Sequence, residues 1–171
     1  MRRLLLPDAG PLFSFAAGDL LDLLLNFDLV ISDVVKMKTI DRGSLPSTSY
    51  ESARLAEFYG AHRQQIQIES TQLGQLIGNR TPKAHAGELS IQSLLIHMAG
   101  AANATILFED LWFVRNRSSF HPSCVLMSTV SFLRLLEDAG LFPSAAQAEA
   151  RIRLRRPHFL ADSWFFTGGP T

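Results

Sequence analysis

The sequence contains a single cysteine, Cys124. One cysteine excludes an internal disulfide framework, and it excludes every metal site that is built from several thiolates. We expect Cys124 to be a buried structural thiol, because unpaired cysteines are among the most buried residues in proteins. The shortage of cysteine also favours a reducing, cytoplasmic location.

The sequence also lacks an excess of charge of either sign. Lys plus Arg and Asp plus Glu each number 16, so the formal net charge is zero. This balance excludes a protein that acts through bulk electrostatics, but it leaves room for a local basic groove that binds nucleic acid. Of the 171 residues, 47% are hydrophobic and 19% are charged, which is too apolar for disorder and sufficient for one buried core.

Long hydrophobic runs are absent as well. Arg2 and Arg3, followed by three leucines, imitate the start of a signal peptide, but Pro7 and Asp8 end the apolar run. No stretch approaches the roughly 20 apolar residues that a membrane-spanning helix needs. We therefore expect a soluble protein with no export signal and no membrane partner.

Short apolar runs alternate along the chain with segments of helical period. Nearly continuous apolar runs are typical of parallel strands that are covered on both faces. Strands that alternate with helices predict an α/β fold, with a doubly wound parallel sheet of five strands and helices on both faces. The predicted strands are residues 4–6, 28–32, 65–68, 104–108 and 124–127. The predicted helices are residues 20–25, 52–61, 73–77, 89–98 (ending near Gly100), 132–136 (ending near Gly140) and 145–154.

One domain is expected to span residues 1–156, since the irregular stretch at residues 41–50 has the composition of a surface loop inside it. Residues 157–171 form a tail that is rich in aromatic side chains. This tail and the leucine-dense residues 20–25 offer more apolar surface than one domain needs to expose. We therefore predict a homodimer. The alternative is that the tail folds back over residues 20–25 of its own chain.

Acidic residues follow the predicted strands at the points where the strands end. Asp8 follows the first strand, Asp33 the second, Glu69 the third, and Glu109 and Asp110 the fourth. Ligands of open α/β sheets bind beyond these carboxyl ends. Converging carboxylates repel one another, so a cluster of them needs a cation, and oxygen ligands favour Mg²⁺ or Mn²⁺.

Each acid also has a structural alternative. Asp33 and Glu69 are placed to cap or charge the starts of helices, and Asp110 could cap the apolar segment that follows it. A cap alone explains Asp8 less well, because apolar residues and a Gly-Pro turn surround it.

Further candidates lie away from the strand ends. Glu88 begins a predicted helix, and His85 lies three residues before it, but the Ala-Gly between them favours a loop. A zinc site at His85 and Glu88 is therefore the weaker alternative. Arginines gather in the C-terminal half, where Arg115 and Arg117 follow Asp110 closely enough to contact phosphate. The alternative for these arginines is a solvated helix face.

Several short motifs resemble those of the PIN-domain family. The match runs in order and in register over about four-fifths of the chain, from residue 4 to residue 142. The resemblance implies a three-layer α/β/α fold. The motifs are Asp-Ala-Gly-Pro-Leu at 8–12, Val-Ile-Ser-Asp-Val-Val at 30–35, Gly-Glu-Leu-Ser-Ile at 87–91, Ile-Leu-Phe-Glu-Asp at 106–110, Ser-Thr-Val-Ser-Phe-Leu at 128–133 and Ala-Gly-Leu at 139–141.

Members of this family are mostly Mg²⁺- or Mn²⁺-dependent ribonucleases, and they include the toxins of bacterial toxin–antitoxin pairs. The resemblance therefore implies an endoribonuclease that cleaves RNA phosphodiester bonds, with an antitoxin protein as a further partner. By position, Asp8, Glu88 and Asp110 would be the catalytic metal ligands. Glu109 and Asp33 would be additional candidates.

One position departs from the family pattern. The family usually has a Glu in the helix after the second strand, about where Met37 and Lys38 stand, and Asp33 comes about one turn too early. The alternative function is therefore a catalytically impaired PIN-like module for binding or regulation, in which Lys38 supplies a cation where a metal would sit. A phospho-receiver fold fits less well, because Asp8 is not part of an acidic pair and no Lys lies near Met127.

Overall fold

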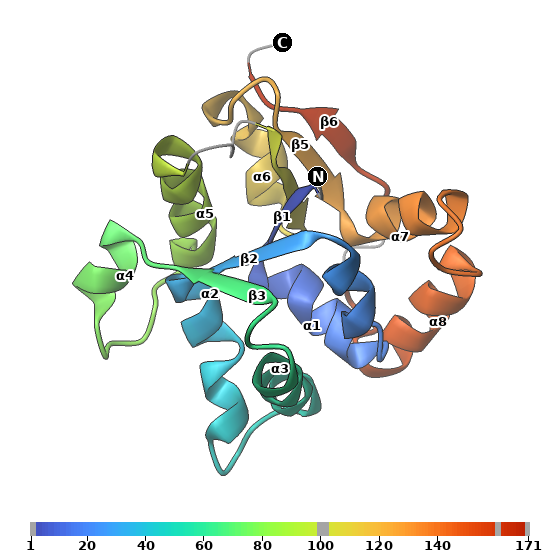
Figure 1. Ribbon diagram of the computed structural model, residues 1–171, viewed down its shortest axis with the longest axis horizontal. Coiled ribbons are helices and arrows are strands. Elements are labelled where there is room, and N and C mark those ends of the chain that lie inside the picture. The colour runs from blue at the N-terminus through green and yellow to red at the C-terminus, as the bar shows by residue number, and fades with distance from the viewer. Residues whose placement is uncertain (1–2, 99–102, 160–161, 170–171) are drawn as a thin grey trace.

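The computed structural model describes residues 3–98, 103–159 and 162–169, and over these residues the chain folds around one six-stranded sheet (Figure 1). The strands are β1 (Leu4–Pro7), β2 (Asp28–Ser32), β3 (Ile66–Glu69), β4 (Thr105–Phe108), β5 (Val125–Ser128) and β6 (Phe165–Thr167). Their order is β3-β2-β1-β4-β5-β6. The five predicted strands are all present and parallel to one another, whereas β6 lies antiparallel to β5 at the edge. The predicted count of five strands is therefore wrong by one.

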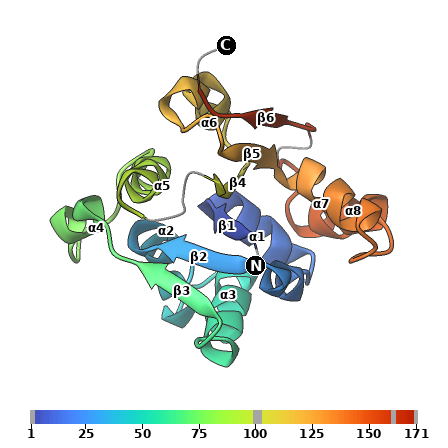
Figure 2. The same ribbon diagram turned by 45° about the horizontal axis from the view of Figure 1, so that its top comes forward.

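Helices cover both faces of this sheet, as the alternation of strands and helices predicts. The α-helices are α1 (Ala9–Ala17), α2 (Asp33–Lys38), α3 (Tyr50–Ala61), α4 (Gln72–Ile77), α5 (Ala86–His97), α6 (Leu111–Arg115), α7 (Thr129–Asp138) and α8 (Ala145–Arg155). Figure 2 shows α1, α3, α7 and α8 on one side of the sheet and α5 and α6 on the other. The result is an α/β fold that is compatible with three layers. None of the helices in the described ranges is long and apolar enough to cross a membrane.

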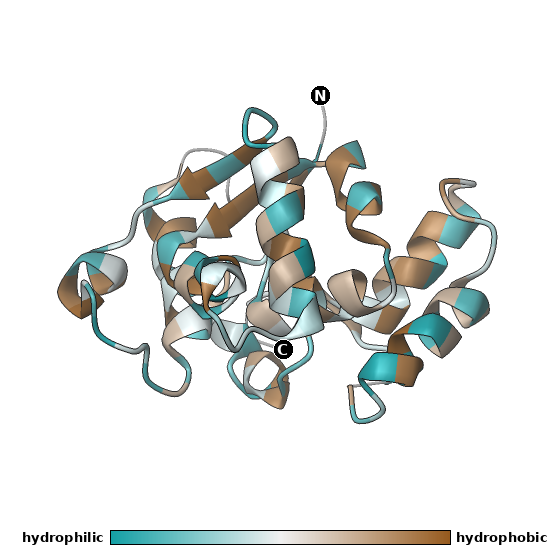
Figure 3. Ribbon diagram, turned by 90° about the horizontal axis from the view of Figure 1, so that it is seen from below, coloured by the Kyte–Doolittle hydropathy of each residue, from teal (hydrophilic) through white to brown (hydrophobic). Residues whose placement is uncertain are grey.

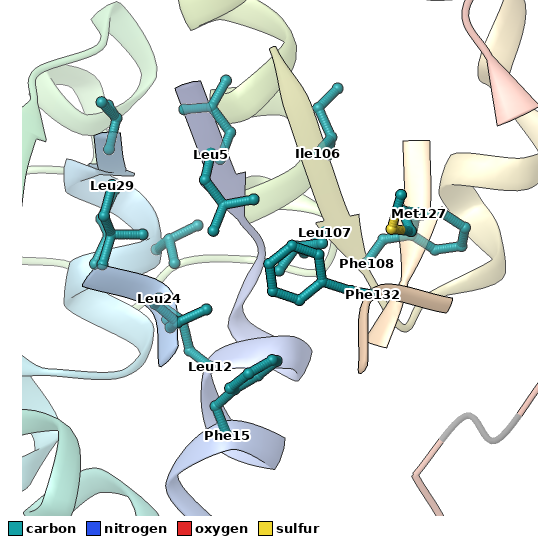
Figure 4. Close-up of a cluster of buried hydrophobic side chains, with 14 of the residues drawn as sticks. Leu5, Leu12, Phe15, Leu24, Leu29, Ile106, Leu107, Phe108, Met127 and Phe132 are labelled. Atoms are coloured by element: carbon teal, nitrogen blue, oxygen red, sulfur yellow. The ribbon is translucent and has the colours of Figure 1, made fainter. Parts of the chain in front are cut away.

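Strands β1, β2, β4 and β5 supply the core because their apolar runs are buried on both faces, whereas the edge strands β3 and β6 are partly exposed. Leu5 and Leu29 are partners in the β1–β2 register, and Leu107 lies near them on β4 (Figure 4). Phe15 of α1 and Phe132 of α7 pack over these strands edge to face, with ring centroids 5.9 Å apart. Figure 3 shows the same division, with hydrophobic residues along the strands and alternating hydrophobic and hydrophilic residues on the helices.

Two helices near the N-terminus differ from the sequence-based expectation. The sequence does not predict α1, because Gly10 and Pro11 together are typical of a turn. Pro11 instead lies in the first turn of the helix, where its missing amide leaves no hydrogen bond unmade. Residues 20–25, predicted as an α-helix, form the 3₁₀ helix η1 (Leu21–Asn26).

The remaining predicted helices are present with shifted ends. The loop expected at residues 41–50 begins with a short 3₁₀ helix, η2 (Asp41–Ser44). Gly140 has a φ of 68° just after α7, as expected for a glycine that ends a helix. Gly100, expected to end α5, lies outside the described residues. Another 3₁₀ helix, η4 (Arg117–Ser119), follows α6.

The aromatic tail packs on its own chain through β6. Phe166 is half-buried, and its ring centroid lies 5.8 Å from that of Phe108 in β4. The tail therefore docks beside β5 rather than over residues 20–25. In that leucine-dense segment, Leu20, Leu21 and Leu24 are buried within the chain. These contacts do not test the homodimer, which stays a prediction.

Replacing Phe166 with Ala is expected to lower the free energy of unfolding by about 1–2 kcal/mol, because this side chain packs inward against Phe108. Phe165, its neighbour in β6, is 64% exposed and points to the opposite face. The matched variant F165A should change the stability by less than about 0.5 kcal/mol. Urea denaturation of both variants checks this, and equal effects would contradict the packing of β6 described above.

Candidate active site

The carboxyl ends of β1 and β4 lie side by side at one edge of the sheet. Pro7 pairs with Leu107 in the strand register, and the amide of Asp8 donates to the Leu107 carbonyl at 2.9 Å. The residue after β1 therefore stands beside those that follow β4, which are Glu109 and Asp110. This placement follows from the parallel pairing of the two strands.

Asp8 occupies the N-cap position of α1, but its carboxylate makes no capping hydrogen bond. Its Oδ1 atom is buried and has no hydrogen-bond partner. Burial, together with the nearby charge of Glu88, raises the pKa of Asp8 from 3.8 to about 7, and the Ala9 amide and the Lys38 ammonium oppose this shift only in part. A helix cap therefore does not account for Asp8.

Glu88 is the third residue of α5, and only 3% of the residue is exposed. The start of α5 is tied to the end of β2 by a short chain of hydroxyl contacts. The Oγ atoms of Ser32 and Ser90 lie 2.6 Å apart, and Ser90 donates to the Gly87 carbonyl at 2.6 Å. The first turn of a helix also favours a carboxylate electrostatically. These contacts fix Glu88 at the sheet edge.

Gly87 allows the start of α5 to approach Asp8 closely. A Cβ atom at position 87 would lie 2.8 Å from Oδ1 of Asp8 and 3.3 Å from Nζ of Lys38. Any side chain here would have to displace the carboxylate. Glycine at this position therefore brings Asp8, Glu88 and Lys38 together.

The two oxygens of Glu88 face different neighbours. Its Oε1 atom lies 3.2 Å from Nδ1 of His85, and its Oε2 atom lies 3.9 Å from Nζ of Lys38 and has no hydrogen-bond partner. His85 adopts a left-handed φ of 59°, which costs a residue other than glycine about 1 kcal/mol or more. Its imidazole stacks on Trp112 with ring centroids 6.3 Å apart.

Asp110 lies at the start of α6 and lines the same pocket as Asp8 and Glu88. It is the N-cap of α6, and its Oδ1 atom accepts the Trp112 amide at 2.7 Å, so the expected structural role as a cap is present. Asp110 also offers a ligand atom to a metal. One such atom each from His85, Glu88 and Asp110 lie within 4.8 Å of one another.

Glu109 is turned away from this cluster. Its Oε1 atom accepts the Thr129 hydroxyl at 2.6 Å, and its Oε2 atom accepts Nη2 of Arg156 at 3.1 Å. Burial raises the pKa of Glu109, and the Arg156 charge and the hydroxyls of Ser14 and Thr129 oppose that rise. The carboxylate is thus engaged on both oxygens.

Asp33 is engaged in a similar way. One of its oxygens accepts the Thr71 amide at 2.9 Å, and the other accepts the Thr71 hydroxyl at 2.8 Å and the Val34 amide at 2.9 Å. These bonds tie α2 to the start of α4. The structure therefore gives Asp33 a structural position, as the helix-start interpretation expected.

A pocket of about 350 Å³ opens over the carboxylates. Asp33, Arg115 and Arg117 are not among the described residues that line it, although the sequence analysis named them as candidates. The sequence analysis did not select Phe13, Arg156 and His158 as lining residues. Phe13 lies in α1, and the other two follow α8, so the tertiary packing of these helices decides whether the side chains reach the pocket. The lining residues are Asp8, Ala9, Gly10, Phe13, Lys38, Glu88, Glu109, Asp110, Arg156, His158 and Phe159.

Comparisons of the chain with protein-family models, with curated proteins and with solved structures found no match. The resemblance to PIN domains therefore rests on the sequence motifs, and the function has to be argued from the site itself.

Replacing Asp8 with Asn is expected to flatten the pH dependence of folding stability. The unfolded chain releases the Asp8 proton near pH 3.8, whereas the folded protein holds it up to about pH 7. The free energy of unfolding therefore falls as the pH rises between these values, by about 4 kcal/mol for this group. Urea denaturation across this range should show the decline in the wild type and not in D8N.

The matched control is D22N, which removes a carboxylate that is 88% exposed in a different part of the molecule. In D22N, the free energy of unfolding should fall with rising pH as much as it does in the wild type. A decline of equal size in D8N and D22N would show that Asp8 ionises normally and would contradict the buried site.

Proposed function

We propose that this protein is a Mg²⁺- or Mn²⁺-dependent endoribonuclease of the PIN-domain type, with Asp8, Glu88 and Asp110 as its catalytic carboxylates. One observation carries the proposal. Two buried carboxylates meet in one pocket at the carboxyl edge of the sheet, and each has an oxygen without a hydrogen-bond partner, Oδ1 of Asp8 and Oε2 of Glu88.

The arrangement fits a divalent cation. A buried anionic oxygen without a partner is unfavourable, and a second carboxylate beside it adds repulsion. A cation bound between such oxygens offsets both costs. Carboxylate oxygens outnumber the single imidazole of His85 in the cluster, which favours Mg²⁺ or Mn²⁺ over Zn²⁺.

Glu88, Asp110 and His85 offer ligand atoms within 4.8 Å of one another, and Asp8, which lines the same pocket, would join them as a further metal ligand. A divalent cation there would supply a water of lowered pKa and would withdraw charge from the scissile phosphate. The chain's own residues contribute the rest. One carboxylate of the pocket would accept the proton of an attacking water. Lys38 and Arg156 line the same pocket and offer positive charge to the phosphates of the strand.

RNA as the substrate is supported by the motif resemblance, and phosphate as the ligand class is supported by the cations of the pocket. The same resemblance makes an antitoxin protein the partner to seek. A small reading frame directly upstream that encodes a DNA-binding protein would support this partner.

A second candidate function is favoured by the position of Lys38. Its ammonium lies 3.9 Å from Oε2 of Glu88, close to where a metal would bind. In this alternative, Lys38 replaces the metal, and the protein is a PIN-like module that binds or regulates without cleaving.

The first test is calorimetric titration with Mn²⁺ at about pH 8, together with cleavage of a single-stranded RNA. We expect the wild type to bind Mn²⁺ and to cleave. D8N and E88Q should each lose at least about 100-fold in metal affinity or in cleavage rate, because each removes a ligand charge.

In the same assays, D22N should match the wild type, since Asp22 does not line the pocket. A wild type that binds Zn²⁺ with one-to-one stoichiometry through His85 and ignores Mn²⁺ would contradict the proposal. Cleavage that survives the loss of Asp8 would contradict it as well.

The second test separates the two functions at Lys38. Replacing Lys38 with Gln removes an ammonium that competes for Glu88. If the protein is a metal-dependent nuclease, K38Q should bind Mn²⁺ about tenfold more tightly, or about 1.4 kcal/mol better. The binding-module function instead predicts that the wild type neither binds Mn²⁺ nor cleaves RNA.

A further inference from the structure

Arg156 reaches the pocket from the end of α8 (Ala145–Arg155). It is the residue after α8, which packs against α1 and α7. Its guanidinium lies 5.6 Å from the centre of the Phe13 ring, and both side chains line the pocket that also holds Asp8, Glu88 and Asp110. A cation from a distant part of the chain thus stands beside the carboxylates.

The guanidinium is only partly used by its partner. Nη2 donates to Glu109 at 3.1 Å, whereas Nε is buried and has no hydrogen-bond partner. Arginine has five N–H donors in a planar fork, and an ion pair built for stability commonly engages two of them with one carboxylate. The contact with Glu109 uses Nη2 of the guanidinium, so other N–H donors of Arg156, including Nε, are left for another anion.

Glu109 is held rigidly behind Arg156. It accepts the Thr129 hydroxyl at 2.6 Å, and its side chain is 6% exposed. A Cβ atom at position 10 would lie 3.0 Å from Cβ of Glu109, so Gly10 leaves room for this carboxylate. The guanidinium therefore has a fixed direction.

We infer that Arg156 forms a phosphate-binding subsite next to the carboxylates and that Glu109 is the positioning residue that orients it. The inference rests on the proposed function, because the phosphate belongs to the RNA strand. Three carboxylates repel a polyanion, so a strand that enters this pocket needs a cation beside them. Arg156 holds a phosphate that neighbours the one being cleaved.

The experiment measures the affinity of a short single-stranded RNA as a function of salt concentration, with Ca²⁺ in place of Mn²⁺. Each phosphate contact adds about 0.7 to the slope of log affinity against log salt for single strands. R156A should lower that slope by about 0.7 and weaken binding at low salt. R156K should restore the slope but not the full affinity, since lysine keeps the charge and lacks the fork.

The matched control is R151A, which removes an exposed arginine from the same helix, one that lies over Phe142 and does not line the pocket. It should leave the slope unchanged. E109Q should weaken RNA binding while leaving the affinity for Mn²⁺ unchanged, as expected for a residue that orients Arg156. Loss of Mn²⁺ binding in E109Q would show that Glu109 is a metal ligand and would overturn the assignment.

The outcomes for the subsite and for the proposed function are separable. If R156A and R151A have the same slope while the wild type binds Mn²⁺ and cleaves RNA, the subsite is wrong and the nuclease function stands. If R156A lowers the slope while the wild type neither binds Mn²⁺ nor cleaves, the subsite stands and catalysis fails. A wild type that binds no RNA overturns both.

Discussion

The close approach between Gly87 and Asp8 is the constraint on which the site depends. With no side chain at position 87, the first turn of α5 comes against the end of β1, and Glu88 is set beside Asp8. The hydroxyl contact between Ser32 and Ser90 holds this position from the side of β2. A side chain at position 87 would push the carboxylate of Asp8 away, so the two acids lie close together only because this residue is glycine.

Hydrogen bonding separates the acids at the sheet edge into two kinds. Asp33 and Glu109 use both oxygens on partners within the chain, so they need no ligand. Asp8 and Glu88 each keep a buried oxygen that has no hydrogen-bond partner. Because folded proteins rarely leave such atoms unpaired, the second kind marks where a ligand would act.

Much of the fold could be predicted from the sequence, because strands buried on both faces leave continuous apolar runs. The edge strand β6 could not, since Phe165 and Thr167 are exposed and only Phe166 packs inward. The sequence also predicted that Asp8 and Asp110 lie near each other, because both follow the carboxyl ends of strands. This prediction requires only that β1 and β4 pair in parallel. Arg156 could not be selected among the C-terminal arginines, because tertiary packing of α8 decides which of them reaches the pocket.

The balance of charge within the pocket is compatible with both proposed functions, a metal-dependent nuclease and a metal-free binding module. The pocket is lined by four acidic side chains, those of Asp8, Glu88, Glu109 and Asp110, and by two basic ones, those of Lys38 and Arg156. With neutral histidines and ionised acids, two negative charges are left, which one divalent cation balances. A proton on Asp8, whose pKa is about 7, removes one of these charges without a metal. Near neutral pH, either a proton on Asp8 or the proposed metal ion would offset this charge, and the metal ion would have to displace the proton in order to bind.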